Sequence, residues 1–198
     1  FDPMPKMFFN ESLKNFRLSN NIQKIDLLKN LGVDFIITKK FDKNFSKTKP
    51  VNFIKNIIFK RLNAKFIFVS NNFKFGNRRE GDVKLLVQNE KKYGYKVIKP
   101  KPLFINKKIV SSSLIRRLLE RGFLSEVNKL LNRKWSIEGV VQRGRQLGKK
   151  IGFPTCNIDI KDYVLAKPGV YAVKVLRKNK PKNLRGIANL GYRPTFNQ

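Results

Sequence analysis

The sequence predicts an α/β fold, in which a parallel sheet with flanking helices is followed by a smaller β-rich region. Helix and strand patterns alternate from residue 19 to residue 98, a rhythm typical of parallel sheets covered by helices. After Arg133, helix periodicity disappears and strand-like segments follow, separated by glycine, proline and lysine turns. Hydrophobic residues make up 41% of the 198-residue chain, which argues against global disorder. We therefore expect one domain over residues 1–132 and another over residues 133–198.

The first expected helix starts after an N-cap at Ser19 and stops at Gly32, because apolar residues recur between them at helical spacing. These apolar residues are Ile22, Ile25, Leu28 and Leu31. A strand over residues 33–37 follows, and Pro50 opens a second helix. The apolar face of the second helix comprises Ile54, Ile57, Ile58 and Leu62.

The remaining elements of the first region follow in order. They are an apolar, buried strand over 66–69, a helix over 82–93 that ends at Gly94, a strand over 95–98, and two short helices over 112–122 and 125–131. In the second region, strands are expected over 135–141, 155–160, 169–176 and 184–190, with a hairpin turn over 177–182. A region of about 65 residues is small for a β-barrel, so we expect it to be incomplete.

The formal net charge of +31, from 44 Lys and Arg against 13 Asp and Glu, predicts attraction to anions. The basic residues are spread along the chain, which favours a generally basic surface. A basic nucleic-acid-binding module is an alternative, supported by this charge and by 17 phenylalanines that could stack on bases. We expect most phenylalanines at core positions and find no recognition motif, so nucleic acid is not the expected partner.

The chain contains one cysteine, Cys156, and no histidine. A Ser-His-Asp triad and histidine-ligated zinc within this chain are therefore excluded. A lone cysteine forms no internal disulfide, so we expect a cytoplasmic protein. No apolar run approaches the roughly 20 residues of a membrane helix, and we expect no membrane association. The start Phe1-Asp2-Pro3 lacks an initiator Met and a signal peptide, which suggests a fragment or a processed piece.

Two segments of the first region could bind a nucleotide. Ser112 and Ser113 stand at the start of an amphipathic helix with Arg116 one turn later, and a helix start with hydroxyls and an arginine suits phosphate. From these residues alone, a simple serine N-cap with solvated arginines is the favoured interpretation. Asn72 follows a predicted strand, where ligands of open α/β sheets bind, but a plain polar loop fits equally well.

The stretch around Gly144, Gly148 and Gly152 could form a third site. Glycines let backbone N–H groups approach phosphate closely, and Lys149 and Lys150 add positive charge. Thr155 and Asn157 lie two residues apart, so in a strand they share one face, where a hydroxyl and an amide oxygen could ligate Mg²⁺. A glycine-rich hairpin before an ordinary strand fits the same residues equally well.

Taken in order, these segments resemble the bacterial bifunctional riboflavin kinase/FMN adenylyltransferase (FAD synthetase) family. The matching segments are Phe1-Asp2-Pro3-Met4-Pro5, Asn72–Gly76 with Gly81-Asp82, Val110–Arg116, Gly152–Asn157, Gly169–Val173 and Ala188–Phe196. They resemble the family's F-D-P-H-P, (D/N)-F-R-F-G…G-D, S-S-T-x-I-R, G-F-P-T-A-N, G-V-Y-A-V and A-N-I-G-x-R-P-T-F segments. The resemblance implies a Rossmann-like nucleotidyltransferase domain followed by part of a small riboflavin kinase β-barrel.

The resemblance also implies two activities, phosphorylation of riboflavin to FMN and adenylylation of FMN to FAD, each with ATP and Mg²⁺. The small-molecule partners are then ATP, riboflavin and FMN, with FAD as a product. In the adenylylation site, the residues at family positions that handle ATP are Asn72, Ser112, Ser113 and Arg116. In the kinase site, Thr155 and Asn157 match Mg²⁺-nucleotide positions, and Gly144 and Lys149 fall in the nucleotide loop.

The chain departs from the family's pattern in several places. The family's first site begins with a segment like G-x-F-D-G-V-H-x-G-H, and this sequence starts after that segment. The family's kinase base is a Glu beyond R-P-T-F, and this sequence stops at Gln198. We therefore expect the isolated segment to turn over neither reaction well. Met4 replaces the usual His, Ser113 keeps the hydroxyl of Thr, and Cys156 replaces Ala as an expected packing change. A catalytically inactive flavin or nucleotide carrier is a further alternative.

Overall fold

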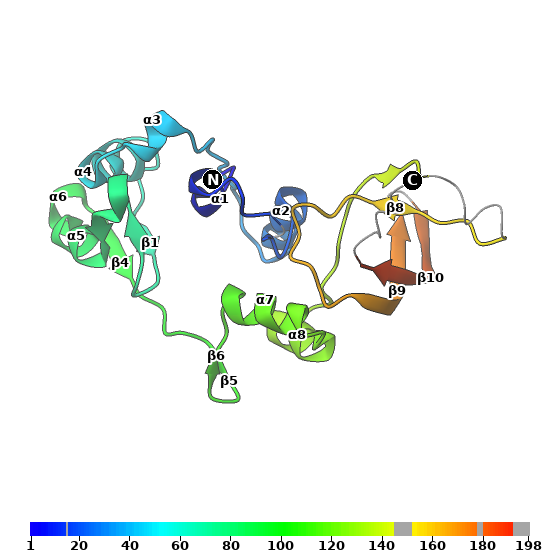
Figure 1. Cartoon of the computed structure of the whole chain (residues 1–198). Helices are drawn as coiled ribbons and strands as arrows, with labels where there is room; N and C mark the ends of the chain where they lie inside the picture. The colour runs from blue at the N-terminus through cyan, green and yellow to red at the C-terminus, as the bar shows by residue number, and fades with distance from the viewer. Residues whose placement is uncertain (15, 145–151, 178–179, 192–198) are drawn as a thin grey trace. The chain divides into compact units, whose positions relative to one another are not determined.

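A computed structural model describes residues 1–14, 16–144, 152–177 and 180–191 (Figure 1). The chain forms two compact units, each built from two stretches of sequence. The first unit comprises residues 1–12 and 37–109, and the second comprises residues 13–36 and 110–198. The predicted boundary between residues 132 and 133 divides the sequence into two consecutive domains. The division into compact units does not test it, so it stays a prediction.

The first unit contains the predicted parallel sheet. Strand β1 (Phe66–Phe68) pairs in parallel with β4 (Lys96–Ile98), with Ile67 opposite Val97. Helices α5 (Val83–Gln88) and α6 (Glu90–Tyr93) lie between these strands in the sequence, which confirms the α/β prediction. The predicted helix over 82–93 is broken at Asn89, and Gly94 ends it with a left-handed φ of 66°.

Pro50 opens the second predicted helix, which confirms that expectation. Helix α4 (Pro50–Phe53) continues into a π-helical segment, η1 (Ile54–Phe59). Ile54 and Ile58 point into the core of the first unit, where they join Phe75, Leu86 and Tyr95. The smaller elements of this unit are α1 (Pro5–Phe9), α3 (Lys43–Ser46), β2 (Lys74–Phe75), η2 (Asn77–Arg79), β3 (Gly81–Asp82), β5 (Phe104–Ile105) and β6 (Lys108–Ile109).

In this part of the chain one strand prediction is wrong and another is confirmed except for its burial. No strand forms over residues 33–37, where Phe35 is 88% exposed. Strand β1 forms but is not buried, since Phe66 and Phe68 are 63% and 66% exposed. In both cases the apolar pattern is present, but the described residues supply neither a ladder partner for 33–37 nor a covering layer for the two phenyl rings.

The phenylalanines also differ from expectation. Phe75 is the only one that is buried in the described part of the chain, and many others are exposed. In the first unit they pack on one another, edge to face, along a chain of rings from Phe9 through Phe41 and Phe45 to Phe53. Phe is therefore mainly a half-exposed packing residue here.

The second unit contains three helices with clear end signals. They are α2 (Asn21–Asn30), α7 (Ser112–Glu120) and α8 (Leu124–Leu131). The N-cap of α2 is Asn20 and not Ser19: its side chain accepts a hydrogen bond from Gln23 N, and Gln23 Oε1 accepts one from Asn20 N. This reciprocal capping box satisfies two N–H groups, whereas Ser19 lies one residue too early to do so.

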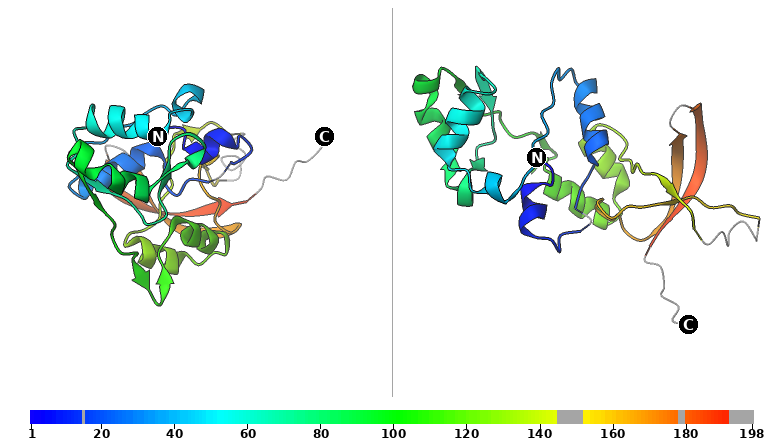
Figure 2. Two further views of the ribbon diagram at one scale, coloured as in Figure 1. Left: turned by 90° about the vertical axis from the view of Figure 1, so that its left-hand side faces the viewer. Right: turned by 90° about the horizontal axis from the view of Figure 1, so that it is seen from above.

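Strands of the second unit form two separate antiparallel pairs among the described residues. The long hairpin of β9 (Gly169–Arg177) and β10 (Lys180–Leu190) confirms two predicted strands (Figure 2). The other two predictions hold only in part, because β7 (Val141–Gln142) and β8 (Asn157–Ile158) are two residues each. Part of the predicted turn over 177–182 lies outside the described residues. None of the helices in the described ranges is long and apolar enough to cross a membrane.

Candidate functional site

The start of α7 is fixed by its cap and by its buried face. Ser111 Oγ accepts a hydrogen bond from Leu114 N at 3.2 Å, which makes Ser111 the N-cap. Leu114, Ile115, Leu118 and Leu119 are all buried, as the spacing predicted. Ser112 and Ser113 are exposed at the first two helical positions. Two hydroxyls therefore stand beside N–H groups at the positive end of an anchored helix, an arrangement that suits an anion.

Arg116 lies one turn further along α7 and is half-buried. Its Nε donates a hydrogen bond to Phe16 O at 2.8 Å, and its Cζ lies 3.6 Å from the centroid of the Phe16 ring. Burial lowers the pKa of Arg116, and the Glu120 carboxylate opposes that shift. An arginine nevertheless stays charged in a protein. The structure thus brings together Ser112, Ser113 and Arg116 on one helix of the second unit.

Asn72 lies in the first unit, in a turn that follows β1. Its Oδ1 accepts a hydrogen bond from Ser70 Oγ at 2.9 Å, and Phe73 N donates to Ser70 O at 3.0 Å. The side chain is exposed beyond the carboxyl end of a parallel strand. That is the edge at which ligands bind in open α/β sheets.

The third candidate site surrounds β7 and β8. Gln142 pairs with Asn157, and Gly144 lies so close to Asn157 that a Cβ at residue 144 would clash with the Asn157 amide group. Thr155 precedes β8 in an irregular segment, and of the two residues only Asn157 lies in a strand. The prediction that both lie on one face of a strand is therefore wrong. Both side chains are exposed, and Lys149 lies outside the described residues. The structure therefore joins Gly144 to Asn157.

Asp159 follows β8 and is the carboxylate next to this site. Its Oδ1 accepts a hydrogen bond from Lys161 N at 3.0 Å, which lowers the pKa of Asp159, and Lys161 Nζ lies 3.2 Å from Oδ2. In the described ranges no group of three or more His, Cys, Asp or Glu side chains could hold a metal ion. A metal site here would use the hydroxyl and amide oxygens of Thr155 and Asn157.

The structure shows where two residues lie that differ from the family's motifs, Cys156 and Met4. Cys156 is exposed, so its expected role in packing is wrong. The reason is that β8 is only two residues long, begins after Cys156 and presents no buried face. Met4 is the N-cap residue of α1 and makes no side-chain capping bond.

Sequence reasoning missed a buried polar network in the second unit. Gln23, 4% exposed, donates through Nε2 to Ser136 O and Oγ, both at 3.1 Å. Tyr163, 3% exposed, donates through its hydroxyl to Gln23 Oε1 at 2.7 Å and accepts from Glu138 N at 3.1 Å. The pattern Asn20-x-x-Gln23 is a capping-box signal that could have located one end of this network.

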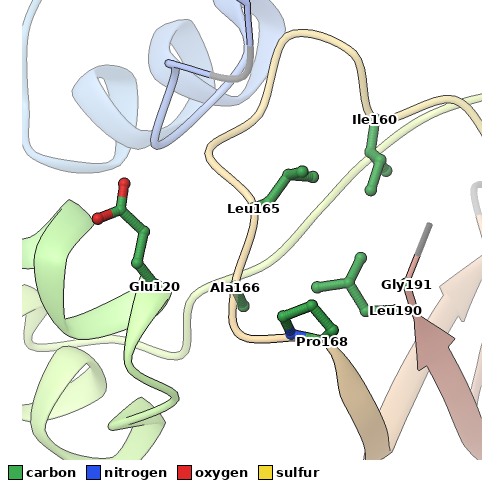
Figure 3. A pocket seen from close by; sticks show the side chains of 7 residues that line it. All are labelled: Glu120, Ile160, Leu165, Ala166, Pro168, Leu190 and Gly191. Carbon is green, nitrogen blue, oxygen red and sulfur yellow. The ribbon is translucent and has the colours of Figure 1, made fainter.

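An open cavity of about 350 Å³ lies in the second unit (Figure 3). Its lining comprises Glu120, Ile160, Leu165, Ala166, Pro168, Leu190 and Gly191. The lining is mostly apolar, Glu120 contributes the one charged side chain, and none of the predicted site residues takes part.

Comparison with sequence families divides the chain into two matches. The model of the FAD synthetase family matches residues 1–114, and the model of the riboflavin kinase family matches residues 131–198. The two matches therefore occur in the order that the resemblance predicted.

Curated relatives match over nearly the whole chain. A Buchnera aphidicola protein named bifunctional riboflavin kinase/FMN adenylyltransferase is 36% identical over 197 residues, covering 99% of this chain and 63% of the relative. The protein of that name from Escherichia coli K12 is 35% identical over 195 residues, covering 98% of this chain and 62% of the relative. The chain thus spans a little under two thirds of the length of these relatives.

Similarity also extends to solved structures. One example is a crystal structure described as a macrolide-efflux protein from Streptococcus pneumoniae, with 27% sequence identity and a TM-score of 0.74. The match covers 90% of this chain and 57% of the other.

Proposed function

The chain belongs to the FAD synthetase family, whose model matches residues 1–114, and from this premise we propose that it serves flavin cofactor synthesis with two ATP-dependent activities. One activity would phosphorylate riboflavin to FMN, and the other would adenylylate FMN to FAD. The observation that carries the proposal is the ordered pair of family matches in one chain, at 1–114 and 131–198. Relatives named for both activities, similar over nearly the whole chain, support it.

For adenylylation, an oxygen of the FMN phosphate attacks the α-phosphorus of ATP, and pyrophosphate leaves. Such a transfer depends on positioning and on charge stabilisation more than on a reactive side chain. The start of α7 offers both: Ser112 and Ser113 can donate to phosphate oxygens, and Arg116 supplies a fixed positive charge. We also assign Asn72, in the turn after β1, to ATP binding in this reaction.

For riboflavin phosphorylation, we assign Gly144, Lys149, Thr155 and Asn157 to ATP and Mg²⁺. The space that a Cβ at residue 144 would fill adjoins the Asn157 amide, so glycine at this position keeps the amide accessible. The oxygens of Thr155 and Asn157 are hard donors that fit an Mg²⁺ ion retaining several waters. When bound, Mg²⁺ would neutralise charge on the ATP phosphates.

The proposed setting is the cytoplasm, and the proposed partners are the small molecules ATP, riboflavin and FMN. The sole cysteine, Cys156, can form no disulfide within the chain, which suits a reducing compartment.

The proposal is tested by incubating the complete protein encoded by the gene with riboflavin, ATP and Mg²⁺, and separating the flavins by chromatography. We expect FMN to appear first and FAD to follow, with one ADP released for each FMN formed and one pyrophosphate for each FAD formed. Absence of both flavin products, together with DNA binding tighter than ATP binding at 150 mM salt, roughly the physiological ionic strength, would favour the nucleic-acid-binding alternative.

A further inference from the structure

Arg116 contacts a segment that is in turn hydrogen-bonded to residues of the region matched by the riboflavin kinase family. Phe16 makes two contacts with the Arg116 guanidinium, one through its carbonyl oxygen and one through its ring. The next residue, Arg17, donates from its N to Asp162 O and accepts at its O from Val164 N, both at 2.8 Å. A parallel bridge between Arg17 and Tyr163 describes the same pairing.

Further bonds tie this segment to the beginning of the kinase match. Trp135 Nε1 donates to Leu18 O at 2.9 Å, and Arg133 Nη2 donates to Ser19 Oγ at 3.2 Å. Residues 16–19 therefore form a strap, with Arg116 on one side and residues 133–164 on the other. Figure 1 shows the chain after β8 passing α2 and then reaching α7, where Lys167 N donates to Leu119 O at 2.9 Å.

The loop that pairs with the strap is itself held by hydrogen bonds to other parts of the second unit. The Tyr163 hydroxyl is buried, and it links the loop to Gln23 at 2.7 Å and to Glu138 at 3.1 Å. Gln23 continues this link to Ser136. A buried polar group that loses its partner is costly, so the network holds the loop in one position.

We propose that the loop Asp162–Val164 of the kinase match positions Arg116 for ATP in the adenylylation reaction, acting through Phe16 and Arg17. Phe16 is then a positioning residue: it occupies the Nε edge and one face of the guanidinium and leaves the terminal nitrogens for phosphate. Fixing the guanidinium beforehand lowers the entropy cost of binding. The inference rests on the proposed function, because it assigns Arg116 to ATP.

The link itself can be tested without ATP, by the NMR signal of the Arg116 Nε–Hε group in the 198-residue chain. We expect the Phe16 ring to shift this proton upfield and the bond to Phe16 O to slow its exchange with water. Arg117, the exposed neighbour on α7, is an internal reference. We expect Phe16→Leu to remove the upfield shift, and Tyr163→Phe, on the kinase side, to speed the exchange of Arg116 but not that of Arg117.

Trp135→Phe is a second kinase-side variant, which keeps an aromatic ring, although a smaller one, and removes the bond to Leu18 O. Phe123→Leu, an exposed phenylalanine at the start of α8, is the matched control and should leave the signal unchanged. An Arg116 signal that responds to neither Tyr163→Phe nor Trp135→Phe in folded protein would overturn the inference.

The consequence for ATP is measured separately, by titrating ATP and following the Ser113 amide signal. We expect Phe16→Leu to weaken ATP binding about two- to fivefold, the magnitude of a partly exposed cation–π contact. If the Arg116 signal responds to the kinase-side variants but Phe16→Leu and Arg116→Lys leave ATP affinity unchanged, the assignment of Arg116 to ATP fails, and the proposed adenylylation site with it. If ATP affinity responds to Arg116→Lys alone, the proposed site stands and the positioning role of Phe16 fails.

Discussion

The start of α7 and the β7–β8 pair are both candidate ATP sites, but the structure prepares them very differently. In α7 four buried apolar residues anchor the helix, Ser111 caps it, and Phe16 holds Arg116 by two contacts. Strand β8 is two residues long, and Thr155 and Asn157 are exposed. The two candidate sites use similar polar side chains. At α7 a buried core fixes their positions, whereas at β7–β8 only a bound ligand would fix them.

Removing the support of α7 should have the largest effect. Leu119 is fully buried, so Leu119→Ala should lower the free energy of unfolding by about 2–5 kcal/mol through lost burial and a cavity. Ile158, 41% exposed in β8, is the matched aliphatic residue, and Ile158→Ala should cost less than about 1.5 kcal/mol. Urea denaturation followed by circular dichroism measures both. Equal losses would remove the distinction between the two sites.

Removing the fixed charge should come next. Arg116→Ala should weaken ATP binding at α7 about ten- to a hundredfold, because hydrogen bonds to charged groups contribute about 1.5–3 kcal/mol. The measurement is an ATP titration followed at the Ser112 and Ser113 amide signals. Arg117→Ala, the same change at the exposed neighbour, should have little effect, and a comparable loss there would point to non-specific attraction by the basic surface.

A smaller effect is expected at the less prepared site. Gly144→Ala places a methyl group against the Asn157 amide, so the amide must move. We expect binding of ATP with Mg²⁺, followed at the Asn157 side-chain amide signal, to weaken about two- to fivefold, the value of one net hydrogen bond. Val140→Ala, at a highly exposed position before β7, is the control. Tighter binding in Gly144→Ala would argue against a nucleotide role for this glycine.

The smallest effect expected is a pH dependence of stability from two buried tyrosines, one in each unit, which is absent near neutral pH. Burial raises the pKa of Tyr95 to about 12, with Glu90 adding to the shift, and burial also raises the pKa of Tyr163. The folded chain then holds these protons more strongly than the unfolded chain. Their contribution to stability is complete below pH 10 and is lost as the pH rises from about 10 to about 12.

Urea denaturation from about pH 9 to about pH 12 measures this contribution. Tyr95→Phe should be less stable near neutral pH, since the hydroxyl donates to Leu86 O at 2.7 Å, but should show a shallower decline at high pH. A decline as steep as in the unchanged chain would show that other groups cause it.

Local signals allowed helix α7 to be predicted from sequence. The spacing of Leu114, Ile115, Leu118 and Leu119 defined a buried face, and serines before it defined a helix start. Both signals act within one or two helical turns, so they do not depend on the rest of the fold. The sequence also indicated the parallel pairing of β1 with β4, through its alternation of strands and helices.

Features that depend on distant residues could not be predicted in this way. The strand expected over 33–37 has a suitable apolar pattern but no ladder partner among the described residues, and a pattern cannot supply one. The hydrogen bonds of Gln23 to Ser136 and Tyr163 join residues 113 and 140 positions apart. Likewise, nothing near Arg116 in the sequence indicated its contacts with Phe16, 100 positions away.

The two-part makeup of the second unit has a consequence for the order of folding during synthesis. Helix α2 and the strap are made early, but Tyr163, Asp162 and Val164 leave the ribosome more than 100 residues later. Closing so long a loop is slow, whereas residues 37–109 can pair β1 with β4 as soon as they emerge. Residues 13–36 must therefore wait, with Gln23 in water, until Asp162, Tyr163 and Val164 have left the ribosome.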